Sequence, residues 1–462
     1  MSWYNFIMSS FNFPKDFIFG AATSAYQIEG AHLEDGKGMS IWDEFSHKKG
    51  KIKNNENGDV ACDHYKRYHE DVKIMNEIGL DAYRGSISWS RVLPEGMGRI
   101  NQKGLDFYDK LTDELLKYDI TPFYTLFHWD LPLALQEKFG GFQSREIVDI
   151  FCEYVEVVVS RLGDRVKNWI TLNEPFEYSA FGHLLGFHAP GIKSPWAYFK
   201  VMHNLLLAHG KSVPVIRDNC IDANVGITLS ITPLHIKKKD KKTQKAHLLA
   251  NQFLNEITLK PLFHGTYPTE LRKKAKMFFP KIKEGDMETI STKIDFVGVN
   301  NYQREWVKYK PFFPIFHFDI SGAGSSFSRG LEGDVEYTLL DWEVYPPSIR
   351  EAVELVDFFA DVPIYITENG AAFKDDAKLG GIRDPRRQNF IKEHLKELHK
   401  AMKNGVDVRA YFVWSLLDCY EWSVGYEPTF GLVSYDDLSK KRFIKDSAYW
   451  YSKVIENRGF YD

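Results

Sequence analysis

Short apolar runs alternate with longer amphipathic stretches along most of the chain. Runs rich in β-branched and aromatic residues are typical of buried strands, whereas apolar residues spaced by three and four are typical of helices. The runs predict eight strands, over residues 18–23, 82–89, 121–128, 168–173, 225–230, 296–300, 364–368 and 408–414. Eight strands separated by helices predict a parallel sheet that closes into a barrel.

The stretches between the strands carry helix signals. Residues 64–78 place apolar side chains at steps of three and four, and Gly79 follows as a stop. A second helix is expected from an N-cap at Ser144 to Gly163, and a third over residues 385–403, before Gly405. The competing fold, a doubly wound open sheet, requires a GxGxxG turn after its first strand, and FIFGAATSAYQIEG has none. We therefore expect an α/β fold, a single (β/α)8 TIM barrel with elaborated βα loops.

Two segments depart from this alternation. Residues 302–347 form a long insertion rich in aromatic residues, which on a barrel stands among the βα loops of the active-site face. The basic run IKKKDKKTQK, residues 236–245, is expected to be a solvated loop rather than a polyanion site, because nothing else in the sequence supports such a site. Residues 1–10 are expected to form a flexible tail, with Met1 or Met8 as the start, and residues 11–462 the barrel domain.

Composition narrows the classes of function. Charged residues make up 26% of the 462 residues, and the formal net charge of −4 argues against nucleic acid as a partner. No stretch reaches the roughly 18 apolar residues of a membrane span, so no membrane partner is expected. The four cysteines lie far apart and no signal-peptide pattern precedes the first strand, which predicts free thiols in a cytoplasmic protein. Neither CxxC nor HExxH occurs, so we expect no metal and no other cofactor. The oligomeric state, a homo-oligomer included, stays open.

Polar side chains gather where the predicted strands end. Barrel enzymes build their sites at the carboxyl ends of the strands, from residues that different strands contribute. In this chain, seven of the eight strands carry or lead into such residues, namely Gln27, Arg84, His128, Trp129, Asn173, Glu174, Asn300, Asn301, Tyr302, Glu368, Trp414, Glu421 and Trp422. Packing alone does not explain so regular a placement.

Two carboxylates stand out among these residues. Glu174 and Glu368 each end an apolar run, WITLNEP and IYITENG. A carboxyl group in apolar surroundings has a raised pKa, which suits a general acid, whereas a carboxylate beside an arginine such as Arg84 stays ionised, which suits a nucleophile. Glycoside hydrolysis uses such a pair. The residues by themselves leave a second interpretation open, in which two unrelated glutamates form salt bridges at the barrel rim.

Longer motifs follow one another in order along the chain. They are FIFGAATSAYQIEGA (residues 17–31), CDHY (62–65), SISWSR (86–91), FHWDLP (127–132), TLNEP (171–175), ITENG (366–370) and a WSLxDxxEW pattern (414–422). With these motifs the chain resembles glycoside hydrolase family 1, the β-glucosidase and β-galactosidase family, over nearly its whole length. The resemblance implies a retaining β-glucosidase that acts by double displacement on terminal non-reducing β-D-glucosyl residues of cello-oligosaccharides and of aryl or alkyl β-glucosides. Galactosyl and fucosyl residues stay open as further substrates.

The resemblance also implies a role for each site residue. Glu174 resembles the acid/base and Glu368 the nucleophile, while Arg84 and Tyr302 resemble the pair that orients the nucleophile. The residues that resemble the substrate-binding shell are Gln27, His128, Trp129, Asn173, Tyr302, Trp342, Trp414, Glu421, Trp422 and Phe430. Within it, Trp414 resembles the platform under the sugar, Trp342 the shelf for the leaving group and Phe430 a wall near the sugar.

Several positions depart from the family pattern. Asn301 stands between Asn300 and Tyr302 where the family usually has Tyr, and Gly85 follows Arg84 where the family usually has Phe. The usual DNFEW is DCYEW here, and Tyr-Glu-Pro-Thr precedes Phe430 in place of the common Tyr-Ser-Lys-Arg. Neither carboxylate is affected, so these departures bear on fine specificity.

Four other functions compete with this interpretation. A thioglucosidase commonly has Gln in place of the acid/base, and a non-catalytic sugar-binding relative should lack one carboxylate, but Glu174 and Glu368 are both present. A metalloenzyme needs clustered ligands, and His64 with His69 is better explained as one face of a helix. The strongest rival is a 6-phospho-β-glucosidase. Members acting on phosphorylated sugars carry a small residue where Glu421 stands and have a nearby Ser–Lys–Tyr cluster, whereas residues 423–429 contain no Lys or Arg.

Overall fold

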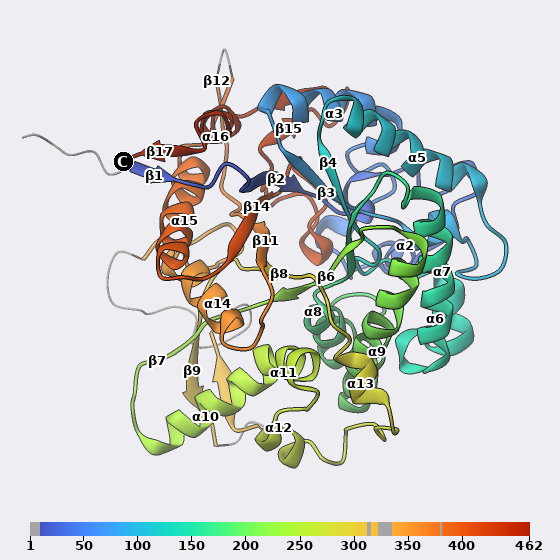
Figure 1. The fold of residues 1–462 in the computed structure, drawn as a ribbon, viewed down its shortest axis with the longest axis vertical. Coiled ribbons are helices and arrows are strands. Elements are labelled where there is room, and N and C mark those ends of the chain that lie inside the picture. The colour runs from blue at the N-terminus through green and yellow to red at the C-terminus, as the bar shows by residue number, and fades with distance from the viewer. Residues whose placement is uncertain (1–9, 312–315, 322–334, 379–380) are drawn as a thin grey trace, which may run out of the picture.

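The eight predicted strands close into a barrel in the computed structural model, which describes residues 10–311, 316–321, 335–378 and 381–462. The barrel strands are β2 (Ile18–Ala22), β3 (Ala82–Ser86), β4 (Thr121–Thr125), β5 (Asn168–Asn173), β6 (Asn224–Ser230), β8 (Phe296–Asn300), β11 (Ile364–Asn369) and β14 (Val408–Trp414). All pair in parallel, in the closed order β11-β14-β2-β3-β4-β5-β6-β8 (Figure 1). The predicted (β/α)8 barrel is confirmed.

Two strands end three residues earlier than predicted. Residues 82–89 were expected to be one strand, but β3 ends at Ser86 and a short helix, α4 (Trp89–Val92), follows. The strand expected over residues 121–128 ends at Thr125. In both places the apolar run continues past the strand because Trp89 and Phe127 are themselves buried in the core. Hydrophobicity therefore does not mark these strand ends.

Long helices surround the barrel. They are α3 (His64–Ile78), α5 (Gln102–Lys117), α7 (Glu146–Leu162), α9 (Pro195–Asn219), α14 (Pro347–Asp357), α15 (Pro385–Lys403) and α16 (Asp446–Asn457). In Figure 1, α3, α5 and α7 lie on one side of the strands, and α14, α15 and α16 on the other. Gly79 ends α3 in the left-handed conformation, and α15 has the predicted bounds. The N-cap of α7 is Arg145 and not the expected Ser144, whose hydroxyl instead accepts a hydrogen bond from the Glu146 amide at 3.3 Å.

Shorter elements elaborate the loops. The helices among them are α1 (Ala25–Ile28), α2 (Ile41–His47), α6 (Leu133–Phe139), α8 (Pro175–Ser179), α10 (Lys241–Asn251), α11 (Ile257–His264), α12 (Thr269–Lys274) and α13 (Asp286–Ile290), with single turns η1 (Glu34–Gly36), η2 (Lys53–Asn55), η3 (Gly141–Gln143), η4 (Ala180–Leu185), η5 (Gln252–Glu256) and η6 (Trp422–Val424). Four small sheets join β1 (Ser10–Asn12) to β17 (Gly459–Tyr461), β9 (Glu305–Tyr309) to both β7 (Leu234–Ile236) and β10 (Phe318–Ile320), β12 (Asp376–Lys378) to β13 (Gly381–Arg383), and β15 (Val433–Tyr435) to β16 (Arg442–Ile444).

The two irregular segments are more ordered than the sequence indicates. The described part of the insertion at residues 302–347 contains β9 and β10, while residues 312–315 and 322–334 lie outside the described chain. The solvated loop expected at residues 236–245 is wrong for its last residues. There α10 begins, because the Asp240 carboxylate accepts hydrogen bonds from the Lys242 and Thr243 amides at 3.0 Å.

The remaining expectations concern the N-terminus, the cysteines and the membrane. Residues 1–9 of the expected tail lie outside the described chain, Ser10 pairs with Tyr461, and the assignment of residues 11–462 to one domain stays a prediction. All four cysteines are buried free thiols, as predicted. No described helix has the length and apolar character needed to span a membrane.

Aromatic rings fill the inside of the barrel. They belong to Phe123 on β4, Phe296 on β8, Tyr365 on β11 and Phe412 on β14. Phe123 meets Phe412 with ring centroids 5.1 Å apart, although their strands are not neighbours. Gly20 makes this contact possible, since a Cβ atom there would lie 2.5 Å from the Phe412 ring. Packing across the barrel therefore depends on a glycine facing a ring.

Replacing Phe412 tests this packing. We expect Phe412→Ala to lower the free energy of unfolding by about 3–5 kcal/mol, because the cavity is enclosed by strands that cannot collapse into it. Phe358→Ala is the matched control, since Phe358 is 78% exposed and its loss should change stability by no more than about 0.5 kcal/mol. Chemical denaturation measures both, and equal losses would show that the interior rings do not support the barrel.

Candidate active site

Glu368 lies on β11 in a buried set of charge-assisted hydrogen bonds. Its side chain is only 3% exposed. Arg84 on β3 donates from Nη1 to Oε1 at 2.5 Å, and the Tyr302 hydroxyl donates to Oε2 at 2.6 Å. Burial and the nearby Glu368 and Glu174 carboxylates raise the pKa of Tyr302 well above its usual range. Tyr302 therefore stays a hydroxyl, and Glu368 keeps two donors.

Arg84 also fixes the neighbouring strand ends. Its Nη2 donates to Asn173 Oδ1 on β5 at 2.7 Å, and Nη1 donates to the Thr367 carbonyl at 3.1 Å. Asn173 in turn donates to Nε2 of His128 at 3.0 Å. Burial, followed by the charge of Arg84, holds the pKa of His128 well below its ordinary value, so this ring is neutral and can accept that bond.

Glu174 lies at the carboxyl end of β5, directly before α8. It has a φ of 47° and is 6% exposed. Among the described residues, one hydrogen bond reaches its carboxyl group, from Asn300 Nδ2 to Oε1 at 2.9 Å. Burial, the Glu368 charge and then Glu177 raise the pKa of Glu174 well above its ordinary value, and this single amide offsets only part of the rise. Glu174 is thus a buried carboxyl group that holds its proton.

Glu421 and Gln27 form a polar pair near the end of β14. Gln27 donates from Nε2 to the Tyr420 carbonyl at 2.7 Å and to Glu421 Oε2 at 3.5 Å. Burial, with a smaller contribution from the Glu368 charge, raises the pKa of Glu421 to about 8. At neutral pH this carboxyl group is therefore mostly protonated and can both donate and accept hydrogen bonds.

Aromatic rings enclose these polar groups. Trp422 lies 4.7 Å from Trp129 between ring centroids and 6.0 Å from His128, which also stacks with Trp414 at 6.1 Å. A second group contains Tyr302, Trp342 and Phe430, whose centroids are 5.2 to 6.1 Å apart. Rings of this kind suit the apolar faces of a sugar, while the polar groups suit its hydroxyls.

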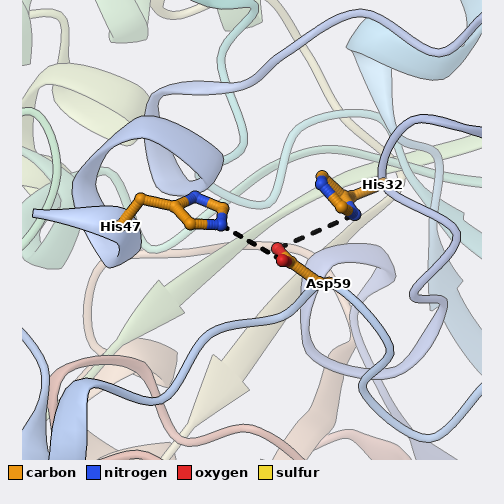
Figure 2. A group of neighbouring side chains, drawn as sticks. All are labelled: His32, His47 and Asp59. Carbon is orange, nitrogen blue, oxygen red and sulfur yellow. Dashed lines mark hydrogen bonds and ion pairs between the residues drawn. The ribbon is translucent and has the colours of Figure 1, made fainter.

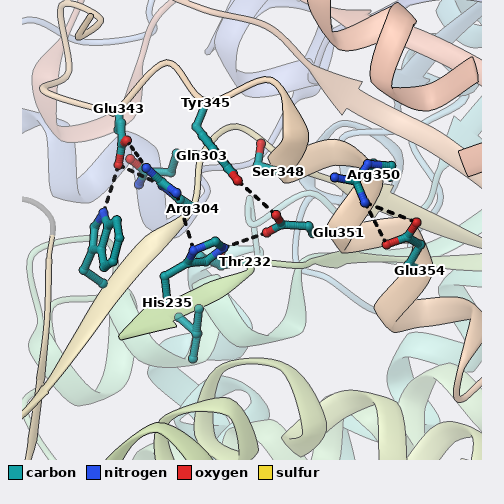
Figure 3. A network of polar contacts seen from close by, with 12 residues as sticks. Thr232, His235, Gln303, Arg304, Glu343, Tyr345, Ser348, Arg350, Glu351 and Glu354 are labelled. Atoms are coloured by element: carbon teal, nitrogen blue, oxygen red, sulfur yellow. Dashed lines mark hydrogen bonds and ion pairs between the residues drawn. The ribbon is translucent and has the colours of Figure 1, made fainter. Parts of the chain in front are cut away.

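A network outside these rings holds the segment that carries Trp342. Figure 3 shows Glu343, which is 7% exposed, accepting two hydrogen bonds from Arg304, at 2.6 and 3.1 Å. The Trp306 indole donates to the same carboxylate at 3.1 Å. The Arg304 guanidinium lies 3.6 Å from the ring centroid of Tyr345. Glu343, the residue next to Trp342, is thus fixed by three hydrogen-bond donors, two from Arg304 just before β9 and one from Trp306 in β9.

The structure places the predicted site residues in a few connected sets. Hydrogen bonds join Arg84, His128, Asn173, Glu174, Tyr302 and Glu368, with Asn300 as a link, and join Gln27 to Glu421 as a separate pair. Ring contacts add Trp129, Trp414 and Trp422 beside His128, and Trp342 and Phe430 beside Tyr302. Sequence reasoning noted Asn300 as a strand-end residue but assigned it no role. It missed Glu177, one turn after Glu174 on α8, where burial raises the pKa to about 7. The three-residue spacing from Glu174 was the available signal.

Comparison with known proteins agrees with this arrangement. A family model described as glycosyl hydrolase family 1 matches residues 9–460. A 1,4-beta-D-glucan glucohydrolase of Thermotoga neapolitana is 46% identical over 453 residues, covering 97% of this chain and 99% of the relative. Beta-glucosidase A of Acetivibrio thermocellus is 47% identical over 459 residues, covering 98% and 100%. A solved family 1 β-glucosidase from Thermotoga maritima superposes with a TM-score of 0.93 at 44% identity, covering 98% of this chain and 100% of that one.

The Arg304–Glu343 pair predicts how firmly the Trp342 segment is held. Lys lacks the planar fork of Arg, so Arg304→Lys should lose one charge-assisted hydrogen bond to Glu343. The amide exchange rate over residues 335–345 should then rise about tenfold, which corresponds to a loss of about 1.5 kcal/mol in local stability. Arg161→Lys is the control, because Arg161 lies on α7 and its ion-pair partners, Asp106 and Asp109, lie on α5. Hydrogen exchange read by mass spectrometry measures both variants. Unchanged exchange over residues 335–345 in Arg304→Lys would contradict the assignment.

Proposed function

Because the chain belongs to glycosyl hydrolase family 1 and is a glycoside hydrolase, we propose that it is a retaining β-glucosidase. Its substrates are terminal non-reducing β-D-glucosyl residues of cello-oligosaccharides and of aryl or alkyl β-glucosides. The observation that supports this best is the contrast between two buried carboxyl groups. Glu368 receives two hydrogen bonds suited to its anion, whereas Glu174 has a pKa raised well above its ordinary value.

The first step joins the sugar to the enzyme. A Glu368 carboxylate oxygen attacks the anomeric carbon, and Glu174 donates its proton to the glycosidic oxygen, so the aglycone leaves as a neutral alcohol. The product is an α-glucosyl ester of Glu368 and an ionised Glu174. Arg84 and Tyr302 hold the attacking carboxylate in place before the reaction.

The second step returns the free enzyme. Formation of the ester removes the negative charge of Glu368, which is the second-largest cause of the raised pKa of Glu174. The pKa of Glu174 therefore falls once the ester has formed, and the carboxylate becomes able to take a proton from water as the water attacks the anomeric carbon. Two inversions release β-glucose.

The other residues divide between the two ends of the substrate. We assign Gln27, His128, Asn173, Glu421 and Trp422 to the hydroxyls of the non-reducing sugar, with Trp129 and Phe430 beside them. Trp414 is the platform under that sugar and Trp342 the shelf for the leaving group. The protonated Glu421 supports this division, because a neutral carboxyl group can donate to one sugar hydroxyl and accept from another.

Loss of each carboxylate should have a different effect. Glu368→Ala should lose activity on every substrate, because no other group attacks the anomeric carbon. Glu174→Ala should keep its first step on dinitrophenyl glucoside, whose leaving group needs no proton, and azide should then accelerate turnover and give β-glucosyl azide. Product NMR and single-turnover kinetics check both.

Two results would contradict these roles. An equal loss of activity on activated and unactivated glucosides in Glu174→Ala would contradict the acid/base assignment. Formation of α-glucosyl azide by Glu174→Ala would contradict the double-displacement mechanism. Glu354→Ala is the matched control and should leave all rates unchanged, since this glutamate lies on the outer helix α14 and pairs with Arg350 of the same helix.

Phosphorylated substrates test the strongest rival. A 6-phosphate beside Glu421 would meet a buried carboxyl group, and both described cations bonded to residues 423–429 are already paired, Lys53 with Glu427 and Arg387 with Asp375 and Asp384. Burying an unpaired phosphate costs several kcal/mol. We expect nitrophenyl glucoside to have a kcat/KM at least about a hundredfold above that of its 6-phosphate, or about 2.7 kcal/mol. Comparable values would favour the 6-phospho-β-glucosidase.

A further inference from the structure

Two histidines and an aspartate converge in the loops that follow β2. His32 lies between α1 and η1, His47 is the last residue of α2, and Asp59 follows η2. One donor atom from each lies within 4.8 Å of the others. Figure 2 shows the two rings on opposite sides of the Asp59 carboxylate, each pointing a nitrogen toward it. Within the described ranges, no other set of three His, Cys, Asp or Glu side chains converges in this way.

The tautomer of His47 is set by the backbone. Nδ1 of His47 lies 2.5 Å from the Asp43 carbonyl oxygen, which can only accept, so Nδ1 carries the hydrogen. Nε2 of the neutral ring therefore has a free lone pair, and it faces Asp59 Oδ2 at 3.1 Å. Histidine metal ligands are commonly oriented in this manner, by a hydrogen bond from the other ring nitrogen to a carbonyl group.

The Asp59 carboxylate is incompletely satisfied. Among the described residues, Oδ1 is buried and has no hydrogen-bond partner, and Nδ1 of His32 lies 3.7 Å from it. A buried carboxylate oxygen without a donor is unusual, because leaving it unpaired costs free energy. A cation between the two rings would satisfy it.

The distances match a small transition-metal ion. Bonds of about 2.0–2.2 Å in a tetrahedral zinc site separate its ligand atoms by roughly 3.3–3.6 Å. The His47 Nε2 atom lies 3.1 Å from Asp59 Oδ2 and the His32 Nδ1 atom lies 3.7 Å from Asp59 Oδ1, on either side of that range. One donor atom from each residue lies within 4.8 Å of the others, so rotation of the Asp59 carboxylate would bring one oxygen to both rings. Imidazole and carboxylate ligands suit Zn²⁺ and its neighbours, whereas Ca²⁺ and Mg²⁺ require oxygen ligands.

We propose that His32, His47 and Asp59 form a binding site for one Zn²⁺ ion, with a water molecule as the fourth ligand. The His47 side chain is 43% exposed, which gives the ion a route from solvent. The ion joins three separate loop segments, and so it stabilises them together. It takes no part in glycoside cleavage, and the proposal does not depend on that activity.

The loops that supply the ligands are already fixed on the barrel. Trp42 in α2 packs against Trp422 with centroids 4.6 Å apart. On the other segment, Tyr426 donates from its amide to Glu56 and from its hydroxyl to the Asn57 carbonyl, at 2.7 and 2.8 Å. Metal binding thus needs only small side-chain rotations, and the joined loops are the ones that support Glu421 and Trp422.

Zinc titration of the full-length, chelator-treated protein tests the site. Calorimetry should give one Zn²⁺ per chain, and Co²⁺ should give the visible absorption bands of a tetrahedral ion. His32→Gln, His47→Gln and Asp59→Asn should each weaken binding at least tenfold, since even outer-shell groups are worth about 10–100-fold. At a zinc concentration a hundredfold above Kd, the wild-type Tm should rise by about 3 °C.

His69→Gln is the matched control. His69 is an exposed histidine whose Nδ1 lies 3.4 Å from the Glu114 carboxylate. It therefore offers one histidine and one carboxylate, without the second histidine of the proposed site. Its variant should bind zinc like the wild type. Three separate variants keep the test valid if one of them does not fold. The proposal would be overturned if the wild-type protein binds no zinc. It would also be overturned if all three variants bind zinc as well as the wild type, because the ion would then occupy other carboxylates.

Discussion

Arg84 places a positive charge in the interior of the barrel, and a charge there must be neutralised where it lies. Burying an unpaired ion costs several kcal/mol, so moving the partners away from the arginine is as unfavourable as moving the arginine away from them. Those partners come from different strands: Glu368 and the Thr367 carbonyl from β11, Asn173 from β5 and Thr125 from β4. One fully buried guanidinium thereby fixes the ends of four strands relative to one another, including its own.

The same arrangement makes two neighbouring carboxyl groups chemically different. Glu368 takes a cation and a phenol as donors. The donor that reaches Glu174 is the Asn300 amide, which Glu174 shares with Asn173. Glu177 adds to the contrast. Its own pKa is about 7, so it gains negative charge only as the pH rises, and that charge then opposes loss of the proton from Glu174. Glu177, which takes no part in the reaction, thus helps to keep Glu174 protonated at pH values at which Glu174 would otherwise begin to ionise.

The sequence predicts the barrel because its signal is repeated eight times. Errors at single strand ends, such as the three extra residues assigned after Ser86, do not affect the count. The strand-end residues were found because parallel strands deliver their last residues to one edge, whereas Trp342 and Phe430 were identified only through the resemblance to the family. Glu177 and the Arg304–Glu343 pair were missed for the opposite reason. The Arg304–Glu343 pair depends on contacts between loops, which no spacing along the chain records, and the three-residue spacing of Glu177 from Glu174 does not show that Glu177 is buried. The convergence of His32, His47 and Asp59 is a third case, because three loops must fold before the residues meet.

The two ends of the candidate site are built by different means, and this has a consequence for specificity. The groups assigned to the non-reducing sugar come from strand ends and adjoining turns, and they share hydrogen bonds with Arg84 or with one another. The Trp342 segment depends instead on Trp306 in β9 of the added sheet and on Arg304 just before that strand, and among the described residues neither side chain bonds to Glu174 or Glu368. Substitutions in that sheet can therefore change which leaving group fits while Arg84 and Glu368 stay in place. The contacts that hold the reacting groups and those that choose the aglycone thus meet mainly at Tyr302, which donates to Glu368 and packs against Trp342.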